Sequence, residues 1–233
     1  MHTILVLLFH SNKKKMKYID IHTHTVIPKT QENRISFYNR IIGQETLGDL
    51  SHIEMFSVGI HPWFIHSDKS NDQLLEQLWE KAKQPEVWMI GEAGLDKLHE
   101  APLERQLYLF EQQALLAEEL HKPLIIHCVK AWSELLALRK KIRPLSPWLI
   151  HGFRGKRELA EQLLKENIYL SFGEQFQSAA LQIAWPSHLF LETDESKLDI
   201  QEIYKKAAVT LSVPTEMLME QIEQNFSLLF SGE

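Results

Sequence analysis

The chain is organised around the stretch Tyr18-Ile19-Asp20-Ile21-His22-Thr23-His24, an apolar-alternating run that ends in two histidines one residue apart. Alternate side chains of a β-strand point the same way, so His22 and His24 share one face. Two imidazoles on one face at the end of a strand make half of a divalent-metal site. An isolated His-x-His is more often a pair of polar residues in a turn. Its meaning therefore depends on how many later strands end in the same kind of residue.

The composition is that of an ordinary globular protein, with 44% hydrophobic and 24% charged residues among 233. The net charge is −6, and no basic face of the kind that clamps long duplex DNA is apparent. Any contact with nucleic acid is therefore expected to be local or to run through a metal. The lone cysteine, Cys128, excludes an intramolecular disulfide and indicates a reducing compartment, so the predicted location is the cytoplasm.

The first 15 residues do not fit the pattern of the rest of the chain. Residues 4–9 are apolar but far too few to span a membrane. A secretory signal has its positive charge before the apolar run, whereas here the lysines at 13–15 follow it. We expect residues 1–15 to be an extension outside the fold, with Met16 as an alternative start and 16–233 as one domain. No membrane association and no obligate protein partner are expected.

Short apolar runs bounded by polar, proline or glycine residues predict eight strands, at 18–22, 34–38, 55–61, 87–95, 123–128, 147–153, 168–173 and 188–194. Helical periodicity predicts helices at 71–83, 103–121, 131–141, 156–166, 199–211 and 214–230. Strands that alternate with helices are parallel, and eight of them indicate an α/β fold of the (β/α)₈ barrel type. The barrel is expected to be trimmed around its second strand, because 26–54 leaves little room for full helices.

The carboxyl ends of parallel barrel strands converge on one rim, where such barrels carry their active sites. The predicted strand ends supply four histidines and two carboxylates: His22, His24, Glu92, His127, His151 and Asp194. Mixed nitrogen and oxygen ligands suit Zn²⁺, Mn²⁺ or a related divalent ion. Six ligands exceed what one hydrolytic ion usually takes from a protein, whereas two ions need such a number and a bridging carboxylate. Glu92 is the candidate bridge.

The ordered motifs resemble those of the TatD family of metal-dependent hydrolases. They are Asp-Ile-His-Thr-His at 20–24, Gly-Ile-His-Pro at 59–62, Gly-Glu-Ala-Gly-Leu-Asp at 91–96, Ile-Ile-His at 125–127, His-Gly-Phe-Arg-Gly at 151–155 and Glu-Thr-Asp at 192–194. Two further stretches agree, a Gln-x-x-x-Phe-x-x-Gln helix within 106–120 and the closing segment 225–230. The resemblance implies a TIM barrel that hydrolyses phosphoesters, commonly of DNA, with two divalent ions such as Zn²⁺, Mn²⁺ or Mg²⁺.

The same resemblance assigns roles to the rim residues. His22, His24, Glu92 and Asp194 match the ligands of the first metal. Glu92, His127 and His151 match those of the second metal. Asp194 would also orient and deprotonate the attacking water. Glu92 and Asp194 are therefore the expected catalytic residues.

The sequence departs from the family at positions that face substrate. Trp63 stands where a second histidine is common, and Val129 stands where an arginine is expected. A phosphodiester needs cationic partners besides the metals, because its non-bridging oxygens carry charge. Trp63 could stack on a base or another aromatic group, as in proteins that bind single strands, or it could equally be a packing residue at the rim. The candidate substrate-binding residues are His61, Trp63, Arg154, Lys97 and Lys130.

Three functions remain open at this level. The leading interpretation is two-metal hydrolysis of phosphodiesters, in single-stranded DNA, at nucleic-acid ends or in a small phosphodiester. The second keeps the metals and changes the bond to another ester or an amide. The third is a degenerate member of the family that binds metal or a ligand without turnover, since fold and function separate readily.

Arg154 is the first choice for the missing cation, because it comes three residues after His151 on a predicted rim loop. We expect Arg154→Ala to lower kcat/KM for a phosphodiester substrate, since a positive partner of the phosphate oxygens would be lost. Steady-state kinetics measure this. An unchanged kcat/KM would remove Arg154 from the site.

Overall fold

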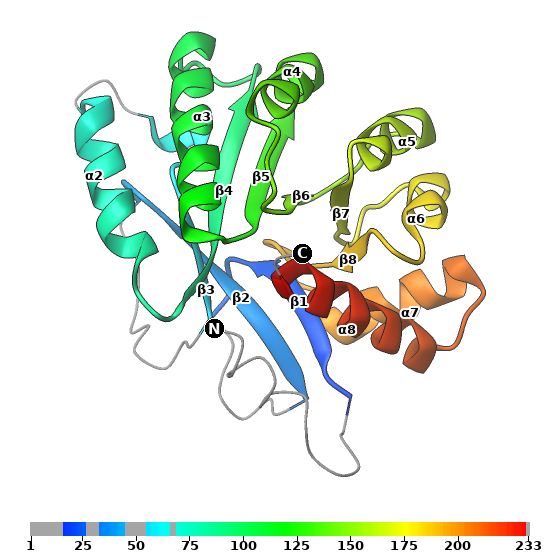
Figure 1. The fold of residues 1–233 in the computed structure, drawn as a ribbon. Coiled ribbons are helices and arrows are strands. Elements are labelled where there is room, and N and C mark those ends of the chain that lie inside the picture. The colour runs from blue at the N-terminus through cyan, green and yellow to red at the C-terminus, as the bar shows by residue number, and fades with distance from the viewer. Residues whose placement is uncertain (1–15, 27–32, 45–54, 66–68, 232–233) are drawn as a thin grey trace.

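All eight predicted strands are present, and each pairs in parallel with the next in sequence order (Figure 1). The computed structural model describes residues 16–26, 33–44, 55–65 and 69–231. The strands are β1 Tyr18–Thr23, β2 Arg34–Ile41, β3 Phe56–Gly59, β4 Val87–Asp96, β5 Leu124–Val129, β6 Trp148–Ile150, β7 Ile168–Phe172 and β8 Leu189–Leu191. The predicted (β/α)₈ barrel is confirmed. The extension predicted at 1–15 and parts of the region expected to be trimmed lie outside the described residues.

The helices lie around the outside of the strands (Figure 1). They are α2 Asn71–Ala82, α3 Leu103–Leu120, α4 Trp132–Ile142, α5 Arg157–Lys165, α6 Ser178–Ala184, α7 Ile200–Leu211 and α8 Thr215–Ser231, with a short 3₁₀ helix, η1, at Pro62–Phe64. The six predicted helices are confirmed to within one residue at each end. The sequence did not predict α6, because its seven residues are too few to show a helical stripe. No described helix is long and apolar enough to cross a membrane.

The barrel closes between β1 and β8 without a continuous ladder. Thr23 and Asp194 form an isolated parallel bridge. Within it, the Asp194 N–H donates to the His22 carbonyl at 3.0 Å, and the His24 N–H donates to the Asp194 carbonyl at 3.1 Å. Backbone pairing at this seam therefore fixes three of the predicted ligands relative to one another.

Side chains complete the seam where backbone pairs are missing. The buried Asp20 carboxylate of β1 accepts hydrogen bonds at 2.8 Å from both the backbone N–H and the hydroxyl of Thr193. The Thr193 hydroxyl also lies 2.8 Å from that of Thr23. On α7, the Tyr204 hydroxyl donates to the Ile19 carbonyl at 3.0 Å and accepts from the Ile19 N–H at 3.1 Å. Buried backbone groups that a β8 partner would otherwise pair are thus satisfied.

Two buried glutamines of α3 hold the ends of β3 and β4. Gln113 accepts from the Ile60 N–H at 2.7 Å and donates to the Ile60 carbonyl at 3.1 Å. Gln106 makes the same pair of bonds with Asp96, at 2.7 and 3.0 Å. An amide side chain offers a donor and an acceptor together, so it can replace a missing strand neighbour. The Gln-x-x-x-Phe-x-x-Gln motif of α3 therefore fixes the backbone at Ile60 and Asp96, and with it the residues next to them in the chain.

We expect Gln113→Ala to lower the free energy of unfolding by about 2–4 kcal/mol, because both backbone groups of Ile60 would be left buried without partners. Urea denaturation measures the change. The matched control is Gln112→Ala, at a half-buried position on the same helix, which we expect to change stability by no more than about 0.5 kcal/mol. Equal losses in the two variants would contradict this role for Gln113.

Candidate metal centre

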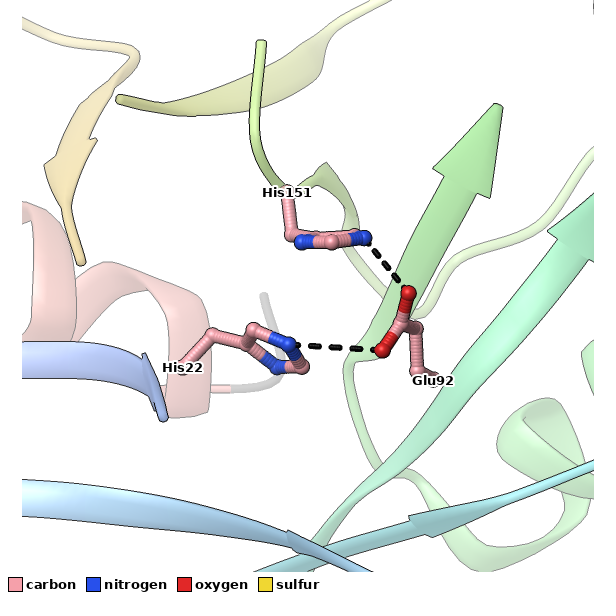
Figure 2. Close-up of side chains that lie close together, drawn as sticks. All are labelled: His22, Glu92 and His151. Atoms are coloured by element: carbon pink, nitrogen blue, oxygen red, sulfur yellow. Dashed lines mark ion pairs between the residues drawn. The ribbon is translucent and has the colours of Figure 1, made fainter. Parts of the chain in front are cut away.

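The buried carboxylate of Glu92 lies among histidines from several strands. Its Oε2 lies 3.4 Å from Nε2 of both His22 and His24. Its Oε1 lies 2.6 Å from Nε2 of His151 and 3.1 Å from Nδ1 of His127. Figure 2 shows Glu92 reaching His22 with one oxygen and His151 with the other. One carboxylate thus faces two pairs of imidazoles, one pair at each oxygen, which is the arrangement of a bridging ligand.

The predicted ligands come from the carboxyl ends of five strands. His22 lies in β1, Glu92 in β4 and His127 in β5, whereas His151 directly follows β6 and Asp194 follows β8. The structure brings together all six predicted metal positions, His22, His24, Glu92, His127, His151 and Asp194.

His61, predicted as a substrate residue, lies inside the same cluster. Its Nε2 is 3.1 Å from Glu92 Oε1, and its ring centroid is 4.5 Å from that of His127. Its Nδ1 accepts the backbone N–H of Trp63 at 3.1 Å, which leaves Nε2 turned toward the carboxylate. Burial lowers the pKa of His61 against the opposing charge of Glu92. His61 is therefore placed to contact whatever binds between Glu92 and His127.

Asp194 lies beside the first histidine pair and reaches solvent. Its Oδ1 is 3.5 Å from His24 Nε2 and 3.8 Å from His22 Nε2. Its backbone φ is 51°, a left-handed conformation that aspartate tolerates better than most residues. The side chain is 28% exposed, whereas that of Glu92 is 4% exposed. Asp194 is thus the carboxylate of the cluster that a solvent molecule can approach.

The chemistry of His22 fits a metal ligand. Its imidazole is fully buried, and neither ring nitrogen has a hydrogen-bond partner within the described part of the chain. Two bare nitrogens in a buried ring are costly, because buried polar atoms normally have partners. A divalent cation between His22, His24 and Asp194 would satisfy one of them. The histidine and carboxylate donors suit such an ion, so the residues present fit the metal that the fold implies.

Electrostatics tie Glu92 and His151 together. Burial opposes ionisation of Glu92, but the charge of His151 and the close contacts with the imidazoles of His127, His151 and His22 hold its pKa well below the usual range. Burial also opposes a charged His151, yet the Glu92 charge and the contact with Glu192 raise its pKa well above the ordinary value. The interior thus stabilises one negative carboxylate with positive partners. Protons and a metal would compete for the same histidine nitrogens.

Two further acids hold the far nitrogens of the second histidine pair. Asp96 Oδ2 lies 3.4 Å from His127 Nε2, and Glu192 Oε1 lies 3.5 Å from His151 Nδ1. Such partners fix the ring orientation of metal-binding histidines. Neither was among the predicted site residues. Strand alternation carries the signal, since Glu92 and Asp96 share one face of β4.

Asn39 is a third contact that was missed. Its Nδ2 donates to Glu92 Oε2 at 3.2 Å, and its Oδ1 accepts the Glu92 N–H at 2.9 Å and the Ser57 hydroxyl at 2.9 Å. The predicted second strand ends at Tyr38, whereas β2 continues to Ile41 and buries every second residue. Asn39 therefore points inward toward Glu92.

Glycines flank Glu92 because β4 and β5 approach closely. A Cβ at Gly94 would lie 1.9 Å from the His127 carbonyl oxygen. A Cβ at Gly91, whose φ is +127°, would lie 2.3 Å from that of Ile125. Any larger residue would push β5 away. The two glycines thus keep His127 within reach of Glu92.

The predicted substrate cations lie on the rim loops. Lys97 forms an ion pair with Glu134 at 2.6 Å, so its charge is already partnered. Lys130 and Arg154 are both exposed.

Cys128, next to His127, is half-buried, and burial raises the pKa of its thiol to about 12. The thiol is therefore protonated near neutral pH and is no nucleophile.

A parallel eight-stranded barrel with histidines and carboxylates at the carboxyl ends of its strands defines a metal-binding α/β barrel. The model of one family of such proteins, described as TatD related DNase, matches residues 39–231, and the chain belongs to this family. The solved structure of YJJV, a TatD homologue from Escherichia coli, has the same fold, with a TM-score of 0.77 at 20% identity over 93% of this chain and 99% of that one.

Two bacterial relatives carry the name 3′-5′ ssDNA/RNA exonuclease TatD. The chain is 31% identical to that of Cronobacter turicensis over 177 residues, which are 68% of this chain and 63% of the relative. It is 34% identical to that of Pantoea vagans over 116 residues, which are 46% of this chain and 42% of the relative. The matched part is therefore less than two thirds of the length of either relative.

We expect Mn²⁺ or Zn²⁺ to raise the Tm of the metal-stripped protein and EDTA to reverse the effect, because an ion that binds only the folded state stabilises it. Glu92→Ala is expected to abolish most of this rise, since Glu92 serves both histidine pairs. Differential scanning fluorimetry measures it. Glu161→Ala, on the exposed face of α5, is the matched control and should keep the full rise. A rise that survives Glu92→Ala would place the metal elsewhere.

Proposed function

We propose that the protein is a divalent-metal-dependent hydrolase that cleaves phosphodiester bonds of nucleic acid, in single-stranded DNA or at strand ends. The observation that carries the proposal is the Glu92 carboxylate, whose Oε2 faces His22 and His24 and whose Oε1 faces His61, His127 and His151. A carboxylate between two sets of ligands is what a pair of ions a few Å apart requires. Membership of the TatD related DNase family supports the choice of a phosphodiester bond.

Two ions, of zinc, manganese or magnesium, are proposed to bind on either side of Glu92. His22, His24, Glu92 and Asp194 would hold the first, and Glu92, His127 and His151 the second. Ions bound there would lower the pKa of an attacking water and neutralise charge that develops on the phosphate oxygens. Asp96 and Glu192 keep His127 and His151 turned toward the site.

Asp194 is the proposed general base. Its side chain is the exposed carboxylate of the cluster, so it can accept a proton from a water in the site. Glu92, being buried and shared by histidines, positions the ligands instead. Arg154 and Lys130 are the proposed partners of the phosphate oxygens, because both are exposed on the loops that carry the ligands. Lys97 is less available because Glu134 already pairs with it.

The proposed partner is a nucleic-acid strand as substrate, with a small phosphodiester as a simpler one. The relatives from Cronobacter turicensis and Pantoea vagans are named for single-stranded DNA and RNA. A net charge of −6 disfavours a broad electrostatic grip on long duplex, whose affinity depends on many phosphate contacts. We place the protein in the cytoplasm, since its lone cysteine indicates a reducing compartment.

We expect wild-type protein with Mg²⁺, Mn²⁺ or Zn²⁺ to cleave single-stranded DNA, RNA or a simple phosphodiester. Asp194→Asn should lower kcat by about 10²-fold or more, because the amide cannot accept the proton. Glu92→Ala should lose activity and metal binding together. Gel assays measure cleavage, and isothermal titration calorimetry measures metal binding. Glu161→Ala is the control for both. If the protein hydrolysed other esters or amides and cleaved no phosphodiester, the proposal would be wrong.

A further inference from the structure

We infer that Trp63 is the residue through which this site recognises its substrate, by stacking its indole on an unpaired nucleobase beside the scissile phosphodiester. The inference rests on the proposed function and adds the residue and the contact by which the site distinguishes a strand with unpaired bases from a duplex. It also assigns a role to the residue at which the chain departs from its family pattern, where a histidine is common.

Trp63 lies directly against the proposed metal cluster. It belongs to η1, two residues after His61, and its ring centroid is 5.2 Å from that of His61 and 6.0 Å from that of His127. Both histidines lie 3.1 Å from the Glu92 carboxylate. A base stacked on this indole therefore belongs to a nucleotide adjoining the cluster, and its phosphate is close to the ions.

The indole is held in one orientation by Asp96. Its Nε1–H donates to Asp96 Oδ2 at 2.8 Å. Asp96 is itself fixed, because its Oδ1 accepts the Leu98 N–H at 2.8 Å and Gln106 holds its backbone. The ring is thus ordered before any substrate arrives, and binding costs little conformational entropy.

The exposed part of Trp63 suits a base without regard to its identity. Trp63 is 50% exposed, whereas the other five tryptophans, all within the described residues, are buried or half-buried. Because the N–H is already used by Asp96, the ring offers only its π surface to a ligand. Every nucleobase has a π face, so stacking tolerates any sequence. A base paired in a duplex is covered by its neighbours and must first be freed, which costs free energy.

A second ring lies beside the indole. The imidazole of His99 is nearly parallel to the indole, with an interplanar angle of 20° and centroids 6.1 Å apart. Its Nδ1 accepts the Ala101 N–H at 3.3 Å, which orients the ring. Leu98, between Asp96 and His99 in the chain, is 66% exposed. The rim beside β3 and β4 therefore presents two nearly parallel rings and an exposed leucine next to a polar cluster, where a base and its phosphate would lie.

The test uses two oligothymidylates that differ only in their bases: one is intact, and the other has abasic tetrahydrofuran residues at the last two positions of each end. Trp63→Ala, Trp63→Phe and the wild type are compared on both. Tyr108→Ala is the matched control, since Tyr108 is an aromatic residue 44% exposed on α3. Circular dichroism and Tm confirm folding. Cleavage gives kcat and KM, and fluorescence anisotropy with Ca²⁺ gives Kd without requiring turnover.

Trp63→Ala is expected to raise KM and Kd for the intact oligonucleotide by about fivefold to 150-fold, the range measured for base–aromatic stacking. It should leave both constants unchanged for the abasic one. Trp63→Phe should retain most of the affinity, and Tyr108→Ala all of it. A blunt duplex should bind more weakly than the single strand in the wild type and equally in Trp63→Ala.

An equal loss on intact and abasic oligonucleotides would overturn the inference, because Trp63 would then act through Asp96 and His127 on the cluster. No loss on either would also overturn it. In another outcome, no substrate is cleaved, the wild type still binds the intact oligonucleotide more tightly than the abasic one, and Trp63→Ala binds both equally. The inference then stands and the proposed nuclease activity fails. The two failures are therefore separable.

Discussion

A single buried carboxylate places the strongest constraint on this structure. Glu92 is 3% exposed and carries a negative charge in the interior. A buried charge is tolerated only where partners surround it, since desolvation costs several kcal/mol. The partners come from distant parts of the chain, with histidines from the ends of four strands, β1, β3, β5 and β6, and Asn39 from β2. The strands must therefore meet at one rim for the charge to be stable.

The weakest part of the barrel wall lies next to this charge. The backbone pairing at the junction of β1 and β8 is the single bridge between Thr23 and Asp194, yet this seam carries the first histidine pair, His22 and His24. Side chains replace the missing ladder: Asp20 takes both donors of Thr193, and Tyr204 pairs both backbone groups of Ile19. Polar residues next to the site thus also stabilise the junction between β1 and β8. Asp20 is one of them, and burial raises its pKa to about 6 against the opposing charge of Arg34.

The two sides of the site agree with the family resemblance to different degrees. The histidines that face Glu92 are those that the resemblance implies, and each contacts the same buried carboxylate, so changing one would leave Glu92 with one partner fewer. The rim that faces solvent carries Trp63, Val129 and exposed cations instead. Rim residues have fewer buried neighbours, so substitutions there change what is bound at little cost in stability. Trp63 is half exposed, and its link to the cluster is the buried Asp96, which also contacts His127.

The sequence by itself determined the barrel and the chemical type of the rim. Period-two strands, helical stripes and polar residues after strand ends predicted eight strands, six helices and six candidate ligands that the structure brings together, since parallel strands must present their carboxyl ends together. Only the tertiary structure decided which atoms meet. Strand alternation assigns a face but no distance. The family resemblance implied that Glu92 lies between the two histidine pairs, and only the structure decides which oxygen faces each of them. The entry of His61 into the cluster and the contacts of Asn39, Asp96 and Glu192 likewise depended on strand length and on packing across the barrel. The His22-Thr23-His24 motif identified the place, and the closure of β1 onto β8 gave it its geometry.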